Sequence, residues 1–210
     1  TSVATNSPTF VSNPLDPMAD YGRASFDIRR SAVLNGVYAL PFGRGNTEWV
    51  NRLVGDWQLS GIETMQSGLP FTPQLAYNPS NDGDTRNPVR PSWNPSFTGP
   101  VVLGLPDEYF NPNAFIQPLA GTYGNVGRNV LQGPNLFETD LSLAKKFNLS
   151  ERLNLQFRAE CFNILNHTNL NTPNPVVYTA ATGGPSPTAG FITSTTTTSR
   201  QIQLGLKLLW

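Results

Sequence analysis

The sequence predicts an all-β fold of antiparallel strands, and three observations lead to it. Five segments alternate apolar and polar side chains with the period of two that a half-buried strand requires. Charged residues are only 13% of the 210-residue chain. Asn, Thr, Ser, Gln, Gly and Pro take their place, a mix that favours strands and long loops over helices. The connections between the five segments alternate between short and very long.

The first two strands are predicted at about residues 29–41 and 56–68. The first alternates from Ser31 to Leu40 and stops at the breaker Pro41-Phe-Gly43. The second has an apolar face that strict parity interrupts with Glu63. Either a bulge near Gly61 shifts the register and turns Glu63 inward, or Glu63 lies near the polar boundary, where a charge costs little.

The third and fourth strands are predicted at about residues 137–148 and 152–165. The residues on the apolar side of the two strands are Phe137, Thr139, Leu141, Leu143, Lys145, Phe147, Leu153, Leu155, Phe157, Ala159 and Cys161. The short polar segment 148–152 joins the strands, so we expect an antiparallel hairpin.

The last strand is predicted at about residues 199–210, and it is the most regular. Its apolar face carries Ile202, Leu204, Leu206, Leu208 and Trp210, opposite Gln201, Gln203 and Lys207. A strand of about ten residues is long enough to cross a bilayer, although a soluble sandwich strand shows the same alternation. An aromatic at the very end is typical of a barrel strand at the edge of the apolar band.

Loop lengths favour the membrane barrel over the sandwich. Segments 42–56 and 148–152 are short, whereas 69–136 and 166–199 are long and rich in Pro, Gly, Asn and Thr. Transmembrane barrels carry short periplasmic turns and long outer loops. If the last strand ends in the periplasm, every long segment, residues 1–27 included, lies outside. The polar faces would then turn into the lumen, with acids and bases able to pair between strands. The predicted lumen-facing residues are Glu138, Asp140, Lys146, Arg158, Glu160 and Lys207. A solvated sheet face explains these six residues equally well.

Other classes of function find little support. Fourteen basic and fourteen acidic residues cancel, so no nucleic-acid partner is predicted. Cys161 and His167 are each the only residue of their kind, but they fall on an apolar face and in a loop. Residues 121–129 lack the Gly-Lys-Ser/Thr ending of a phosphate loop, and residues 81–85 lack the later glutamate of an EF-hand. We expect no enzyme, no catalytic residue, no cofactor and no metal.

The chain contains neither a signal peptide nor an apolar run long enough for a membrane helix. Export to an outer membrane requires a signal peptide. We therefore expect either a cytoplasmic protein or the mature or C-terminal part of a longer one.

A set of short motifs in fixed order resembles a known family. These motifs are DYGRASFD at 20–27, GVYALPFG at 36–43, GDWQLSG at 55–61, QSGLPF at 66–71, GTYGNVGRN at 121–129, FRAECFN at 157–163 with Asn166-His167, and SRQIQLGLKLLW at 199–210. Together they resemble the C-terminal barrel of Oar-like TonB-dependent transporters. Glu63 departs from the apolar residue that the family pattern leads us to expect.

The resemblance implies that residues 1–210 are the C-terminal part of a TonB-dependent receptor barrel of about 22 strands. They would contribute about five strands and long extracellular loops. It implies that the remaining strands, a plug, a TonB box and an N-terminal carboxypeptidase-regulatory-like domain lie upstream. The expected partners are these missing parts, the TonB complex acting through the plug, the lipid bilayer and the barrel-assembly machinery. The terminal face Ile202, Leu204, Leu206, Leu208 and Trp210 would be the assembly signal.

The expected function is therefore that of an outer-membrane transporter fragment. Two alternatives stay open: a non-transporting surface or adhesion barrel, and a soluble all-β carbohydrate-binding module. Aromatic residues of the long loops either bind sugars or peptides or pack the loops together, and packing is the favoured interpretation. These aromatics are Tyr77, Trp93, Phe97, Tyr109, Phe110, Phe115, Tyr123 and Tyr178.

Overall fold

The computed structural model describes residues 11–13, 15–42, 50, 53–83, 89–150 and 153–210. The chain divides into two compact units, which are described separately. The sheet unit comprises Arg30–Gln66, Leu136–Asn169 and Thr197–Trp210. The loop unit comprises Thr1–Arg29, Ser67–Asn135 and Leu170–Thr196.

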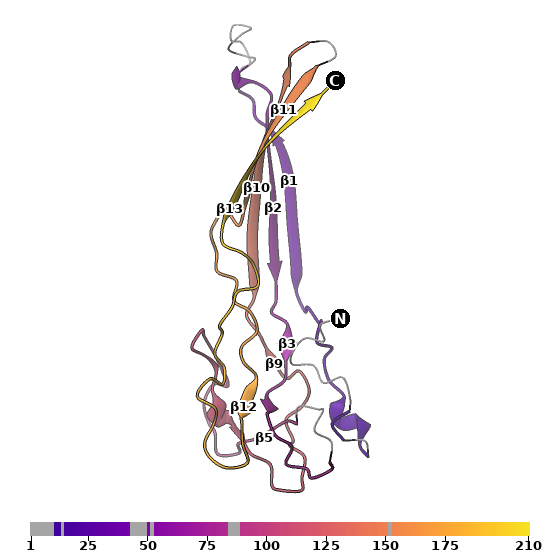
Figure 1. Ribbon diagram of the computed structural model, residues 1–210, viewed down its shortest axis with the longest axis vertical. Helices are drawn as coiled ribbons and strands as arrows, with labels where there is room; N and C mark the ends of the chain where they lie inside the picture. The colour runs from indigo at the N-terminus through magenta and orange to yellow at the C-terminus, as the bar shows by residue number, and fades with distance from the viewer. Residues whose placement is uncertain (1–10, 14, 43–49, 51–52, 84–88, 151–152) are drawn as a thin grey trace. The chain divides into compact units, whose positions relative to one another are not determined.

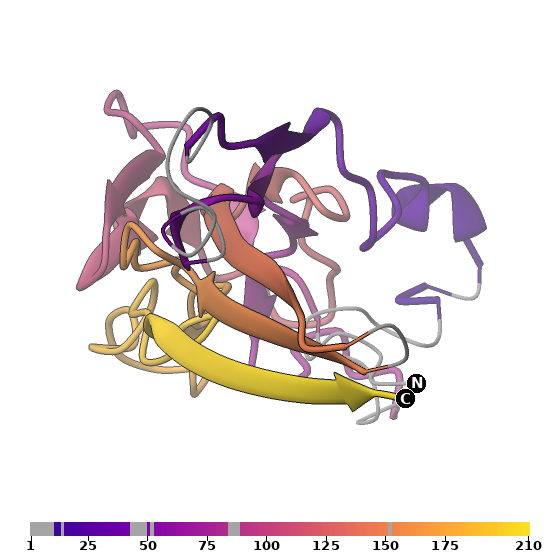
Figure 2. The ribbon, with the colours of Figure 1, turned by 90° about the horizontal axis from the view of Figure 1, so that it is seen from above.

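The sheet unit is a single antiparallel sheet of five long strands (Figure 1). The strands are β1 (Ser31–Ala39), β2 (Trp57–Gln66), β10 (Leu136–Asn148), β11 (Asn154–Phe162) and β13 (Gln201–Leu209), and they pair in that order. β13 curves along its length, as Figure 2 shows, in keeping with the twist that L-residues impose on strands. The prediction of an all-β fold with a long antiparallel sheet is confirmed. The five strands do not close into a barrel.

The pairing registers sort the side chains of the sheet unit onto two faces, because residues opposite each other in an antiparallel ladder point the same way. The apolar face carries Ala32, Leu34, Gly36, Tyr38, Trp57, Leu59, Gly61, Glu63, Met65, Phe137, Thr139, Leu141, Leu143, Lys145, Phe147, Leu155, Phe157, Ala159, Cys161, Ile202, Leu204, Leu206 and Leu208. The alternate residues form the polar face. The alternation read from each strand alone thus extends in phase across all five strands.

Glu63 lies on the apolar face, within an unbroken ladder. It pairs with Leu34 on one side and Thr139 on the other, and no register shift interrupts either pairing. The alternative of a bulge near Gly61 is therefore wrong. The Thr139 hydroxyl donates a hydrogen bond of 2.5 Å to Glu63 Oε2, while the buried Oε1 has no hydrogen-bond partner among the described residues.

The loop unit is held by four pairs of short strands. β3 (Pro70–Phe71) pairs with β9 (Leu131–Gln132), β5 (Ser92–Trp93) with β8 (Phe115–Ile116), and β6 (Val102–Leu105) with β7 (Glu108–Phe110), all antiparallel. β4 (Gln74–Leu75) and β12 (Val176–Tyr178) pair in parallel, an exception to the antiparallel pattern.

Helix is a minor component of the described residues. Two 3-10 turns, η1 (Pro17–Asp20) and η2 (Pro112–Ala114), occur in the loop unit, and Val50, Leu53 and Val54 of the sheet unit are also helical. Among the described residues, no helix combines the length and apolar character needed to span a membrane.

The core of the loop unit is built around aromatic rings that pack in tilted and edge-to-face pairs. Phe71, Phe110 and Phe115 are at most 1% exposed. The ring of Phe110 lies 5.8 Å from that of Phe71 and 5.9 Å from that of Phe115, and Trp93 packs on Phe115 at 5.0 Å. Long segments of Pro, Gly and Asn-rich chain therefore form a compact body, because each supplies a few apolar residues to one shared core.

Candidate functional site

The six polar residues that the sequence pointed to share the polar face of the sheet unit. They are ordered along the strands by charge. The acids Glu138, Asp140 and Glu160 lie toward the end where β10 begins and β11 ends, and the bases Lys146, Arg158 and Lys207 lie toward the β10–β11 hairpin. The polar face therefore has an acidic half and a basic half.

Ion pairing on this face is sparse among the described residues. Arg158 Nη1 lies 3.4 Å from Glu160 Oε1, two residues away on the same strand. Pairing between neighbouring strands was expected instead. The register explains the difference, since the residues directly opposite Arg158 are Ala144 and Gly205, and those opposite Glu160 are Ser142 and Gln203. Asp140 accepts a hydrogen bond from the backbone N–H of Asn163 at 2.8 Å.

Aromatic side chains gather on the apolar face near the hairpin end. Tyr38, Trp57, Phe147 and Phe157 all lie there, and Trp210 follows β13 directly with the parity of the same face. The ring of Trp57 meets that of Phe157 edge-on at 6.0 Å. Aromatics gathered near one end of an apolar face are typical of the membrane–water interface of a barrel.

Lys145 is the cationic exception on the apolar face, and it is only 3% exposed. Its ammonium group lies 5.5 Å from the Trp57 ring and 5.0 Å from the Phe147 ring, and it donates a hydrogen bond to the Gly55 carbonyl. The two rings and the carbonyl compensate the charge in place of a carboxylate. Such a lysine belongs near an interface, where its long stem can lie along apolar surface.

The residues of the predicted assembly signal are exposed. The exposed fraction is 72% for Ile202, 68% for Leu204, 72% for Leu206, 47% for Leu208 and 91% for Trp210. β13 pairs only with β11, and β1 only with β2, among the described strands. The sheet unit thus has two open edges and an uncovered apolar face. This is the surface expected of a sheet that meets lipid and further strands, and it is costly in water.

Cys161 and His167 do not form a nucleophile pair. Cys161 is half-buried on the apolar face between Leu141 and Ile202. The His167 ring instead packs edge-on against Phe137 at 5.6 Å, and its Nδ1 lies 3.1 Å from Asn169 Oδ1.

An asparagine cluster around His167 was missed by the sequence analysis. Buried Asn163 donates to the carbonyls of His167 and Thr198 and accepts from the His167 N–H, at 2.9 to 3.0 Å. Asn169, 1% exposed, bonds both backbone groups of Phe137. These side chains replace ladder bonds where β10, β11 and β13 leave the sheet. The only signal in the sequence was the density of Asn in 163–169.

The loop aromatics are mostly structural, as the favoured interpretation expected. Tyr109, Phe110, Phe115 and Tyr178 are buried in the core, and Tyr77, Trp93 and Phe97 pack against it. The hydroxyls of Tyr109 and Tyr178 donate to the carbonyls of Gln132 and Phe115, at 3.1 and 2.9 Å.

We expect the loop unit to lose stability in alkaline solution. Burial raises the pKa of Tyr109 and of Tyr178. In the unfolded chain the tyrosine hydroxyls ionise at about pH 10. The contribution of the two buried tyrosines to stability is therefore complete below that pH, and it is lost as the pH rises through their higher pKa in the folded protein. Near-UV circular dichroism and tyrosinate absorbance measure the transition. Tyr109→Phe should shift its midpoint, whereas Tyr21→Phe, at a residue 83% exposed, should not.

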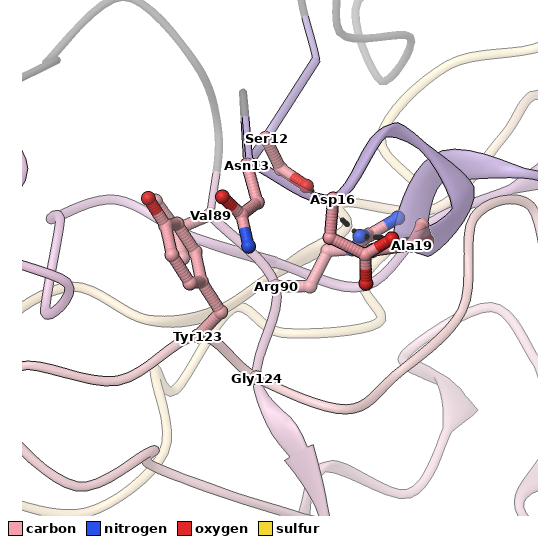
Figure 3. Close-up of a pocket in the computed structure, with 8 residues that line it drawn as sticks. All are labelled: Ser12, Asn13, Asp16, Ala19, Val89, Arg90, Tyr123 and Gly124. Carbon is pink, nitrogen blue, oxygen red and sulfur yellow. Dashed lines mark hydrogen bonds between the residues drawn. The ribbon is translucent and has the colours of Figure 1, made fainter.

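A cavity of about 190 Å³ lies in the loop unit, and Arg90 is among its lining residues (Figure 3). Its lining residues are Ser12, Asn13, Asp16, Ala19, Val89, Arg90, Tyr123 and Gly124. Arg90 Nη1 lies 2.8 Å from Asp20 Oδ1, and Nη2 donates to Ser12 Oγ and to the Ala19 carbonyl, each at 3.0 Å. Burial lowers the pKa of Arg90, and Asp20 opposes that effect. The carboxylate of Asp20 therefore compensates the charge of Arg90 within the fold. The contacts of Arg90 with Ser12, Ala19 and Asp20 join the two segments of chain.

The described residues of the two loop segments weighed as ligand sites make contacts within the loop unit. In 121–129, Val126 is buried and Gly124 lies so close to the Arg90 and Pro91 carbonyls that a Cβ there would clash. In 81–85, residues 84 and 85 lie outside the described residues, and the carboxylate of Asp82 accepts hydrogen bonds from Asn78 and Tyr123. No group of three or more His, Cys, Asp or Glu residues suited to a metal occurs in the described ranges.

An antiparallel sheet with one apolar face, one polar face and aromatics gathered near one end is the pattern of a transmembrane β-barrel segment. The family model described as an outer membrane beta barrel domain matches residues 1–203, and the chain belongs to that family. Membership places it in the outer membrane. No curated protein and no solved structure matches it.

Proposed function

We propose that the chain is part of an outer-membrane TonB-dependent transporter of the Oar-like kind, in which the five-stranded sheet forms part of the wall of a barrel of about 22 strands. The single observation that carries the proposal is the in-phase separation of an apolar and a polar face across all five strands. In this arrangement the apolar face contacts lipid, and the polar face lines a water-filled lumen through which a solute passes.

The open edges support further strands of the same protein as partners. Backbone N–H and C=O groups without partners cost several kcal/mol each in the hydrocarbon region, so a stable sheet must be closed there. We propose that strands outside residues 1–210 pair with β1 and β13, and that a plug fills the lumen and connects to the TonB complex. The role is transport rather than catalysis, with no cofactor or metal.

The exposed face of β13 supports the barrel-assembly machinery as a further partner. Its alternating large aliphatic residues and terminal Trp210 lie open on one side of an unpaired edge. A recognition protein can reach both the side chains and the backbone of such a strand.

Cysteine accessibility tests the orientation of the sheet. In the full reading frame with Cys161→Ser, the neighbouring substitutions Lys207→Cys and Leu206→Cys place a thiol on opposite faces of β13. A membrane-impermeant maleimide should label Lys207→Cys and leave Leu206→Cys unlabelled in intact outer membranes. Equal labelling of both would contradict a lipid-facing and a lumen-facing side.

Crosslinking to the periplasmic domain of TonB tests the proposal that the protein is connected to the TonB complex. We expect a crosslinked product with the full reading frame and its loss when the TonB box of that frame is deleted. A folded, surface-exposed barrel that never crosslinks to TonB would favour the alternative of a non-transporting surface or adhesion protein. Extraction of the chain without detergent would favour the soluble module.

A further inference from the structure

The basic half of the polar face brings together three cations from three neighbouring strands. Lys146 of β10, Gln156 of β11 and Lys207 of β13 pair in one row across the sheet. Arg158 lies one row away on the same face, between Ala144 and Gly205. We call Lys146, Gln156, Arg158 and Lys207 the basic patch.

The charges of the basic patch are available to a ligand. Lys146 and Lys207 are exposed, and neither has an ion-pair partner among the described residues. The Arg158 side chain is 53% exposed, so solvent screens its 3.4 Å contact with Glu160. By contrast, the side chain of Arg23, which pairs with Asp27, is 19% exposed, and the pair of Arg90 and Asp20 is buried.

The dimensions of the patch suit a single anionic group. Neighbouring strands lie about 4.8 Å apart, so the Cα atoms of Lys146 and Lys207 are separated by about 10 Å across Gln156. Two flexible lysine stems can close over that distance, and the Gln156 amide supplies a neutral donor between them. Ala144 and Gly205 flank Arg158 with almost no side chain, so its guanidinium can reach an anion above the sheet.

Among the three acids of the same face, Glu160 contacts one cation of the patch, Arg158, and the charges of the two lysines are left uncompensated. Glu138 and Asp140 lie toward the opposite end of β10. Glu160, two residues after Arg158 on β11, is the acid of this face nearest to the patch, and it contacts Arg158. The row that holds Lys146, Gln156 and Lys207 contains no acid.

We propose that the basic patch is an anion-binding site in the barrel wall, which binds the phosphate or carboxylate group of a small water-soluble solute. This proposal rests on the proposed function in one respect, namely that the polar face borders water. The fork of Arg158 supplies paired donors to two oxygens of the anion, and the two lysines supply point charges.

Phosphate binding to the purified full reading frame in detergent tests the site, with inorganic phosphate as the probe and ³¹P NMR or calorimetry as the readout. Lys146→Gln and Lys207→Gln should each weaken binding about two- to fivefold, the range of a solvent-exposed ion pair. Lys207→Arg keeps the positive charge and should bind phosphate as the unaltered protein does. Arg29→Gln, which removes an exposed base outside the sheet unit, is the matched control and should leave binding unchanged.

A carboxylate introduced beside the patch, which competes with phosphate for Arg158, provides a second variant that keeps every cation. A Cβ at Gly205 would meet nothing closer than the Arg158 carbonyl at 3.9 Å, so a side chain fits there. Gly205→Glu should therefore fold, place a carboxylate beside Arg158 and weaken phosphate binding by about two- to fivefold, as removal of one cation does, whereas Gly205→Gln should retain it.

The proposal is overturned if the triple variant Lys146→Gln/Arg158→Gln/Lys207→Gln binds phosphate as the unaltered protein does, or if Arg29→Gln weakens binding equally. Failure of the proposed function has a different signature. It would change the cysteine labelling or the TonB crosslink, neither of which depends on phosphate.

Discussion

Replacement of Asp20 by alanine is expected to destabilise the loop unit by about 3–5 kcal/mol, the cost of leaving one member of a buried ion pair without its partner. The side chains of Arg90 and Asp20 are only 6% and 7% exposed. Asp20 also accepts hydrogen bonds from the Ser12 N–H at 2.5 Å and from the Ser12 hydroxyl at 3.0 Å. The substitution removes these contacts together and leaves the buried guanidinium of Arg90 without its carboxylate partner.

Hydrogen exchange of the loop-unit amides measures the effect, because local opening of segment 11–20 does not require the sheet to unfold. Asp16→Ala is the matched control. Asp16 is exposed in the same segment, and its substitution should change stability by less than about 0.5 kcal/mol.

A double variant separates the charge from the packing. Asp20→Ala/Arg90→Met replaces both charged partners, so most of the loss should be recovered. If Asp20→Ala alone were as stable as the unaltered protein, Arg90 and Asp20 would not hold residues 12–20 in place.

Replacement of Phe110 by alanine is the second large effect, with an expected loss of about 3–5 kcal/mol in the loop unit. The Phe110 side chain is 0% exposed and contacts the rings of both Phe71 and Phe115. Truncation leaves a cavity among rings that neighbouring short strands hold in place, so the site cannot collapse to fill it.

The measurement is again exchange protection or protease resistance of the loop unit, with Phe26→Ala as the control. Phe26 is 81% exposed, and its truncation should have an effect within about 0.5 kcal/mol. A loop unit that tolerates Phe110→Ala without loss of protection would contradict the interpretation that the loop aromatics serve packing.

The sheet could be read from the sequence because its information is local. Each strand carries its own alternation, and β1, β2, β11 and β13 lie within the ranges expected from that alternation, while β10 begins one residue earlier. Glu63 is the instructive exception. The sequence shows that Glu63 falls among the apolar positions, but it does not show whether a bulge interrupts the strand there. The pairing of Glu63 with Leu34 and Thr139 shows that the ladder is unbroken.

The loop unit could not be read in the same way. Its strands are two to four residues long, too short to show a period, and the parallel pairing of β4 with β12 joins segments about a hundred residues apart. The asparagine cluster was missed for the same reason, since Asn163 bonds the backbone of Thr198, just before β13, and Asn169 bonds that of Phe137 in β10.

Local alternation and loop length therefore established an antiparallel membrane-type sheet with one apolar and one polar face, since the side-chain period of a strand is fixed by its backbone. The tertiary structure alone decided which charges share a row, which aromatics are buried, and that Arg90 is neutralised by Asp20. These features depend on register and on contacts between residues far apart in the chain. Neither the register nor these long-range contacts produce a periodic pattern in the sequence.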